Sequence, residues 1–195
     1  MNGKKHGNGK YVMSNGSSYE GTFSDNMMDG SGTYKWSSGA SYVGEFKKDL
    51  KHGKGVFTSA EGDVYNGEYK NDKRNGHGTA TYPDGSCYDG EWLDDNWKEG
   101  PFIRGDDGHK FVGGWGENGS AGFGTYIYPD GASRSGIWDG VTLLEGEGVI
   151  RYPDGSSYDG QIKNNLRHGH GIYTLADGTV QTGQFDNDVF VNPTQ

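Results

Sequence analysis

The chain has 195 residues, of which 37 are glycine, and its formal net charge is −9. Leu, Ile, Val and Phe make up only about 15% of it, which excludes a large aliphatic core and is typical of disordered chains. The 26 aromatic residues argue against disorder, because their burial offsets the entropy lost on ordering. The acidic balance argues against nucleic acid as a partner, since phosphate neutralisation requires clustered Lys and Arg.

The sequence shows no targeting or membrane-spanning segment. Residues 1–6 have no apolar stretch behind their lysines, and the longest aliphatic run is residues 141–144, so we expect neither a signal peptide nor a transmembrane helix. The single cysteine, Cys87, cannot form an internal disulfide. We therefore expect a soluble cytoplasmic protein, with association with a membrane or the cytoskeleton as the alternative.

A period of 23 residues runs through the chain. In most periods an aromatic residue is followed by a glycine two positions later and by a second aromatic residue four positions later. A Gly-x-Gly pair lies eleven and thirteen residues after most starts, and a turn glycine, three times within Tyr-Pro-Asp-Gly, precedes the next start. The periods start at Tyr19, Tyr42, Tyr65, Tyr88, Phe111, Arg134 and, after one inserted residue, Tyr158.

Each period predicts two short strands. The start residue, the glycine and the second aromatic residue alternate along the chain and therefore share one face of a strand. A polar loop of about five residues joins the two strands, and a glycine turn leads to the next period. Aromatic rings cover the gaps that strand glycines leave, and no window has helical periodicity. The sequence thus predicts an all-β fold, an elongated single-layer antiparallel sheet of about eight hairpins with roughly sixteen strands.

The pattern Tyr-x-Gly-x-aromatic followed by Gly-x-Gly-x-aromatic resembles the MORN repeat (membrane occupation and recognition nexus) family. The resemblance implies one domain over residues 1–195: a partial repeat at 1–18, repeats starting at 19, 42, 65, 88, 111, 134 and 158, and a terminal half-repeat at 181–195. It also implies grooves that hold partner peptides. Too few residues lie outside the repeats for a catalytic domain, so we expect a non-enzymatic scaffold without catalytic residues.

The repeat pattern is irregular between residues 92 and 148. Glu99-Gly100-Pro101 replaces the glycine pair of one repeat, and Trp97 lies off the pattern between polar residues. Tryptophans spaced by 23 residues stack in a row on one face, and Trp is a frequent interface anchor. We therefore predict a groove that binds a peptide or helical segment of a partner protein; the alternative is that its aromatic residues only fill the core, as Phe23 and Phe46 do. The predicted groove residues are Tyr88, Trp92, Trp97, Phe111, Trp115, Arg134 and Trp138.

Basic residues gather in the loops between the paired strands and predict a second kind of surface. A rim formed by Lys5, Lys47, Lys51, Lys73 and Arg74 would bind anionic phospholipids, with each group contributing about 1 kcal/mol. The alternative is that these side chains are only solvated. The competing functions are thus a peripheral membrane adaptor and an architectural part of a cytoskeletal or ciliary assembly.

Metal sites, cofactors and assembly complete the expectations. The histidines recur beside the glycine pairs, and no three or four ligands converge, so we expect no metal and no cofactor. The first and last predicted strands, residues 6–13 and 181–185, each offer an unpaired edge. Strand addition at these edges predicts a homo-oligomer, unless residues 189–191 fold over the C-terminal edge.

Overall fold

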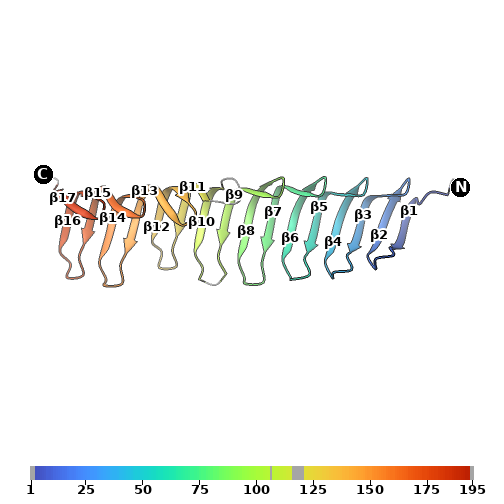
Figure 1. Cartoon of the computed structure of the whole chain (residues 1–195), viewed down its shortest axis with the longest axis horizontal. Coiled ribbons are helices and arrows are strands. Elements are labelled where there is room, and N and C mark those ends of the chain that lie inside the picture. Colours follow the sequence, from blue (N-terminus) through green and yellow to red (C-terminus); the bar gives the residue numbers. More distant parts are fainter. Residues whose placement is uncertain (1–2, 106, 116–120, 194–195) are drawn as a thin grey trace. The chain divides into compact units, whose positions relative to one another are not determined.

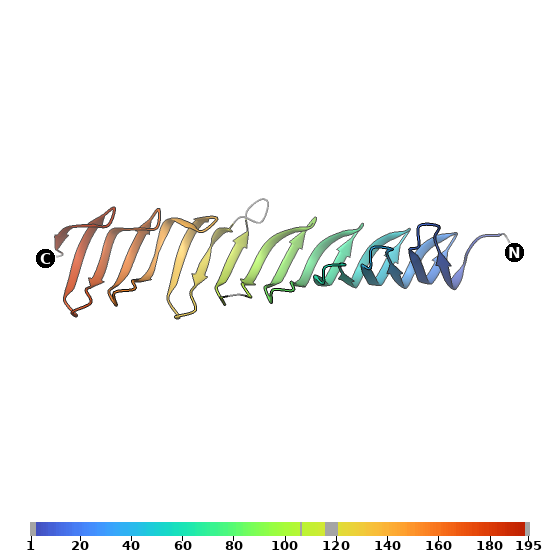
Figure 2. The same cartoon turned by 60° about the horizontal axis from the view of Figure 1, so that its bottom comes forward.

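The computed structural model describes residues 3–105, 107–115 and 121–193, with only the backbone at 121, 192 and 193. These residues form 17 strands of one open antiparallel sheet and no helix, which confirms the predicted all-β fold of repeated hairpins (Figure 1). The chain divides into two compact units, residues 1–98 and 99–195, and the boundary lies within β9. In each unit the strands lie side by side in chain order (Figure 2).

Each strand of the first unit pairs antiparallel with the next strand along the chain. The strands up to the unit boundary are β1 (Gly7–Val12), β2 (Ser18–Ser24), β3 (Met27–Lys35), β4 (Ser41–Lys47), β5 (Leu50–Thr58), β6 (Val64–Lys70), β7 (Lys73–Thr81), β8 (Cys87–Leu93) and β9 (Asn96–Ile103).

The second unit repeats this antiparallel arrangement. Its remaining strands are β10 (Lys110–Trp115), β11 (Ala121–Ile127), β12 (Ser133–Asp139), β13 (Thr142–Arg151), β14 (Ser157–Lys163), β15 (Leu166–Thr174), β16 (Val180–Asp186) and β17 (Val189–Pro193). The last of these strands contains residues 189–191, whose folding over the C-terminal edge was the alternative to an unpaired edge. It pairs with β16, on the edge that the sequence pattern had left unpaired.

The described turns within the hairpins are shorter than predicted. Ser24 pairs with Met27 and Lys47 with Leu50, so two residues form the turn, and the expected loop of about five residues is wrong. In the β12–β13 turn, Gly140-Val141, only the glycine has positive φ. In six other turns both residues have positive φ, which Asn and Asp tolerate better than other non-glycine residues and which matches the twist of the flanking strands. These turns are Asp25-Asn26, Lys48-Asp49, Asn71-Asp72, Asp94-Asp95, Asn164-Asn165 and Asn187-Asp188.

The second turn residue also ties its hairpin to the preceding one. The backbone N–H of Asp72 donates to the carbonyl of Lys51 at 2.9 Å, and its carboxylate accepts from the Lys51 N–H at 2.8 Å. Each such pair satisfies two backbone groups that no strand partner reaches. The same pair of bonds joins Lys5 to Asn26, Met28 to Asp49, Arg74 to Asp95, Leu143 to Asn165 and Arg167 to Asp188.

The core is a ladder of aromatic rings over glycines. Tyr42 is fully buried, its hydroxyl donates to the carbonyl of Glu45 at 3.0 Å, and a Cβ at Gly55 would collide with its ring. Phe46 of the same repeat and Tyr69 of the next stand edge to face with Tyr42, at centroid distances of 5.0 and 5.2 Å. The predicted covering of strand glycines by rings is confirmed, and it explains why each strand pair needs two glycines opposite each other.

Candidate functional site

The sheet of each unit has two different faces. The core face carries the start residue and the second aromatic residue of each repeat, which are buried against one another, as Tyr19 and Phe23 are. The open face carries the residues between them, such as Glu20, Val43 and Glu45, which are exposed. Side chains of neighbouring strands therefore form separate rows on the two faces.

The predicted groove residues of the first unit lie on its core face. Tyr88 and Trp92 are 0% and 2% exposed, and the indole N–H of Trp92 donates to the carbonyl of Gly78 at 2.8 Å. Trp97 is half-buried and stacks on the Tyr88 ring at a centroid distance of 4.9 Å. Tyr88 and Trp92 thus fill core positions, which is the alternative that the sequence left open to their lining a peptide-binding groove.

The other four groove residues lie in the second unit. Phe111 and Trp138 are each 3% exposed and belong to its core, with the Trp138 indole donating to the Gly124 carbonyl. Trp115 is half-buried and packs against Phe111, with 4.7 Å between the two ring centroids. Arg134 lies over the Tyr128 ring, 4.7 Å from its centroid. The seven residues are therefore divided between two units, and four of them are buried.

Three of the five predicted rim residues cover the aromatic ladder. The Lys51 ammonium lies 4.9 Å from the Tyr69 ring centroid, and burial lowers the pKa of this amine. The Arg74 guanidinium lies 4.1 Å from the Trp92 ring and pairs with Asp95 at 3.1 Å. Lys5 lies over Tyr11. Lys47 and Lys73 are exposed beside the two-residue turns.

We call this place over the rings the cap position, the ninth residue after a repeat start. Among the described residues it is occupied by Lys5, Met28, Lys51, Arg74, Trp97, Leu143, Arg167 and Phe190. Trp97, which the sequence pattern left in a loop, is thus the cap of its own repeat, stacked on Tyr88 where other repeats place a cation. The 23-residue spacing of Lys51, Arg74 and Trp97 is the signal that could have identified this position.

A hollow of about 290 Å³ opens on the core face of the first unit. It lies at Ala80, which pairs with the next start residue, Tyr88. At the equivalent position the other repeats place a larger side chain: Tyr11, Tyr34, Phe57, Phe102, Tyr126, Ile150 or Tyr173. The missing ring leaves the space open. The residues of this Ala80 hollow are Lys51, Phe57, Asp63, Val64, Tyr65, Tyr69, Arg74, Ala80, Tyr82 and Asp95.

Burial and charge give the Ala80 hollow a mixed lining. Burial raises the pKa of Tyr65 to about 12 and raises the pKa of Tyr82. Arg74 is held by Asp95, whereas Lys51 has no carboxylate within ion-pair distance among the described residues. The hollow therefore offers ring surfaces and one cation that is free to take an acceptor.

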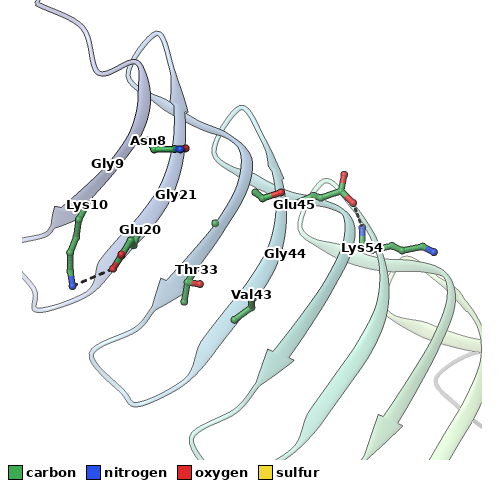
Figure 3. Close-up of a pocket in the computed structure, with 12 residues that line it drawn as sticks. Asn8, Gly9, Lys10, Glu20, Gly21, Thr33, Val43, Gly44, Glu45 and Lys54 are labelled. Atoms are coloured by element: carbon green, nitrogen blue, oxygen red, sulfur yellow. Dashed lines mark hydrogen bonds and ion pairs between the residues drawn. The ribbon is translucent and has the colours of Figure 1, made fainter.

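A second, wider hollow of about 820 Å³ lies on the open face of the same unit. Figure 3 shows its floor of glycines, with Thr33 and Val43 along one side and Asn8 and Glu45 along the other. Lys10 pairs with Glu20 at 3.4 Å, and the Glu45 carboxylate accepts from the backbone N–H of Lys54 at 3.1 Å (Figure 3). This hollow offers mainly backbone and hydroxyl groups.

Two further kinds of site concern metals and membranes. Within residues 3–105, 107–115 and 121–193, no three His, Cys, Asp or Glu side chains are grouped as metal ligands. No helix of this part of the chain is long and apolar enough to cross a membrane.

Repeated hairpins, ladder and turns define a β-hairpin repeat protein. The sequence model of the MORN repeat matches residues 1–18, 19–41, 42–64, 65–87, 111–133, 143–157 and 158–180. The chain therefore belongs to the MORN repeat family. Two of the unmatched stretches, 88–110 and 134–142, fall in the two repeats whose pattern is irregular. The third is residues 181–195. No curated protein sequence matches the chain.

The solved structures to which the chain is similar are distant from it in sequence. The TCP10 domain of Danio rerio CPAP has 12% identity and a TM-score of 0.41, covering 90% of this chain and 82% of its own. The TCP domain of Drosophila melanogaster SAS-4, solved in complex with a proline-rich motif of Ana2, has 14% identity and a TM-score of 0.33 over 92% and 85%. A CPAP G-box domain has 15% identity and a TM-score of 0.37 over 92% and 99%.

Proposed function

We propose that this MORN-repeat chain is a non-catalytic scaffold that binds a peptide segment of a partner protein at the Ala80 hollow. The observation that carries the proposal is the missing ring at Ala80, which leaves about 290 Å³ between aromatic neighbours. A partner's aromatic or large aliphatic side chain would occupy the place that Phe57 and Tyr173 take in their own repeats. This proposal moves the predicted groove from residues 88–138 to the repeats that start at Tyr42 and Tyr65.

The lining supports a peptide occupant. Phe57, Tyr65 and Tyr82 offer ring edges and faces for one inserted side chain. Side chains that fill such pockets contribute most of the binding energy of many interfaces. Lys51 lies at the same hollow and lacks an ion-pair partner among the described residues. A backbone carbonyl or a carboxylate of the peptide would accept from this ammonium and would offset its burial.

Filling the hollow tests the proposal. Ala80→Phe places in this repeat the ring that Phe57 supplies in the preceding one, so the variant should fold at least as stably as the parent chain. Val56→Thr is the matched control, because Val56 lies on the open face of the same unit and Thr33 and Thr79 occupy the equivalent position. Affinity purification with quantitative mass spectrometry would compare the parent chain and both variants.

The expected result is a partner that the parent chain and Val56→Thr retain and that Ala80→Phe loses. The purified partner segment should then bind Ala80→Phe at least roughly tenfold more weakly than the parent chain. Equal recovery of every partner by a folded Ala80→Phe variant would show that the hollow is not the binding site.

A further inference from the structure

Two apolar residues interrupt a polar row on the open face of the second unit. Phe123 on β11 pairs with Ile137 on β12, and their side chains are 73% and 49% exposed. The strand order places them on neighbouring strands (Figure 1). A large exposed aromatic side chain next to a branched aliphatic one forms a patch of the kind that marks an interaction surface.

The repeat register shows how unusual this pair is. The positions equivalent to Ile137 are Thr22, Glu45, Glu68, Glu91, Gly114, Gln161 and Gln184. The positions equivalent to Phe123 include Asn8, Ser31, Lys54, His77 and His170. Phe123 and Ile137 belong to two successive repeats, and the equivalent positions named above all carry a polar residue or glycine. The ladder on the core face does not require apolar residues here, because these side chains point away from it.

The pair is flanked by a glycine on one side and by acidic residues on the other. Gly114 has no side chain, and among the described residues the nearest atom to a Cβ there would be the Phe123 carbonyl oxygen, at 3.9 Å. On β13, Glu145 pairs with Ile137, and Glu147 lies two residues further on; both are exposed. An occupant would thus meet a ring, a branched chain and two carboxylates.

Charge is also divided unequally between the two units. The second unit has six Lys and Arg against 13 Asp and Glu, a net charge of −7, whereas the first has 12 against 14, a net charge of −2. Long-range attraction to this unit therefore favours a basic partner, and it acts within the Debye length of about 10 Å at 0.1 M salt. The apolar pair supplies the short-range contact that charge alone does not give.

We infer that the open face of the second unit, at Phe123, Ile137, Glu145 and Glu147, docks a partner-protein segment in which an aromatic or aliphatic residue is flanked by Lys or Arg. Its apolar residue packs on Phe123 and Ile137 over the space at Gly114. Its basic residues pair with the two glutamates of β13. This surface is separate from the Ala80 hollow, so the scaffold has one peptide site in each unit.

A displayed library of random 12-residue peptides tests the inference, because such a library samples basic, acidic and uncharged segments alike. The library is selected on the parent chain and counter-selected on the double variant Phe123→Ser, Ile137→Gln, whose residues occur naturally at these positions as Ser31, Gln161 and Gln184. Both sites are exposed, so the variant should fold with almost unchanged stability. Ile172→Thr, 45% exposed before substitution and on the open face of β15, is the matched control.

The expected result is enrichment of peptides with Lys or Arg beside an aromatic or aliphatic residue. Such peptides should bind the double variant at least roughly tenfold more weakly than the parent chain and the Ile172→Thr control about equally well. Binding should also weaken with Glu145→Gln and Glu147→Gln together, and with added salt. Ala80→Phe should leave it unchanged, which separates this surface from the proposed function.

Three results would overturn the inference. The first is that no selected peptide depends on Phe123 and Ile137, and the second is that the dependent peptides are acidic or uncharged. The third is a parent chain that self-associates and a double variant that does not, measured by light scattering, because the patch would then bind a second copy of the chain.

Discussion

Gly32→Ala tests the packing of rings over glycines on which the whole ladder depends. Gly32 lies on β3 beneath the buried Tyr19 ring, and an added Cβ would collide with that ring. The ring would have to move, and its hydroxyl would lose the bond to the Thr22 carbonyl at 3.0 Å. Overpacking of this kind costs about 1–3 kcal/mol, and loss of the hydrogen bond adds about 1 kcal/mol.

Gly9→Ala is the matched control, because Gly9 lies 23 residues before Gly32 in the same repeat position. The Cβ of Ala at this site would have its nearest neighbour, the Phe23 ring, at 3.7 Å, which is an ordinary contact. Gly→Ala at an unstrained site stabilises by about 0.4–1 kcal/mol through the unfolded chain. The same term offsets part of the cost at Gly32, leaving a net loss of about 2 kcal/mol.

Thermal unfolding followed by circular dichroism would measure the difference. A loss of about 2 kcal/mol corresponds to a fall of about 4–8 °C in the melting temperature for a chain of this size, whereas Gly9→Ala should match or exceed the parent chain. Tyr19→Leu should cost less in the Gly32→Ala background than alone, since the smaller side chain relieves the collision. Equal melting of Gly32→Ala and Gly9→Ala would refute the argument that rings dictate the glycines.

Three further predictions concern the turns, the rim and pH. Asp72→Ala should lower the free energy of unfolding by about 1–2 kcal/mol in urea titrations, because the Lys51 N–H loses its carboxylate acceptor and Ala tolerates positive φ poorly. Asp72→Asn, like the natural Asn26, should change the free energy little. An equal loss in both variants would show that the acceptor is unimportant. Lys47→Glu with Lys73→Glu should abolish any salt-sensitive cosedimentation with anionic liposomes, since these are the exposed rim residues; retention by the double variant would place lipid contact elsewhere. Burial raises the pKa of Tyr65 and Tyr158 to about 12, so the folded state keeps their protons while the unfolded chain loses them near pH 10. Stability from these groups should be complete below about pH 10 and fall as the pH rises towards about 12. Tyrosinate absorbance that titrates near pH 10 in the folded chain would contradict this.

Much of the fold follows from the 23-residue spacing. A ring, a glycine and a second ring at alternate positions must lie on the same face of a strand. The turns did not follow, since Lys48-Asp49 and Asn71-Asp72 lack the glycine that usually marks a two-residue hairpin turn. Their positive φ is stabilised by bonds to the preceding repeat, such as that from Asp72 to Lys51. Contacts between repeats are not visible in the sequence of one hairpin.

The site was harder to predict because the sequence shows which residues are present more readily than which are missing. Trp92 and Trp138 were predicted to line a groove because they are large aromatic residues, yet both are buried in the ladder. Ala80, a small residue in a row of rings, defines the hollow by what it lacks. Phe123 is the converse case, because it is one aromatic residue among many and is unusual only by its place. It lies on the open face, where the equivalent residues of other repeats are polar. Both signals require the register to be compared across all repeats.

The cap position gives each repeat a degree of independence from its neighbours. Its occupants include a lysine, an arginine, a methionine, a tryptophan and a leucine, while the tyrosine and glycine framework beneath them keeps the same geometry at Tyr19, Tyr42 and Tyr158. One substitution at this position changes the charge and shape of a single rung without disturbing strand pairing. A series of such substitutions would give each hairpin its own side-chain chemistry at the cap position, while the fold of the array stays the same.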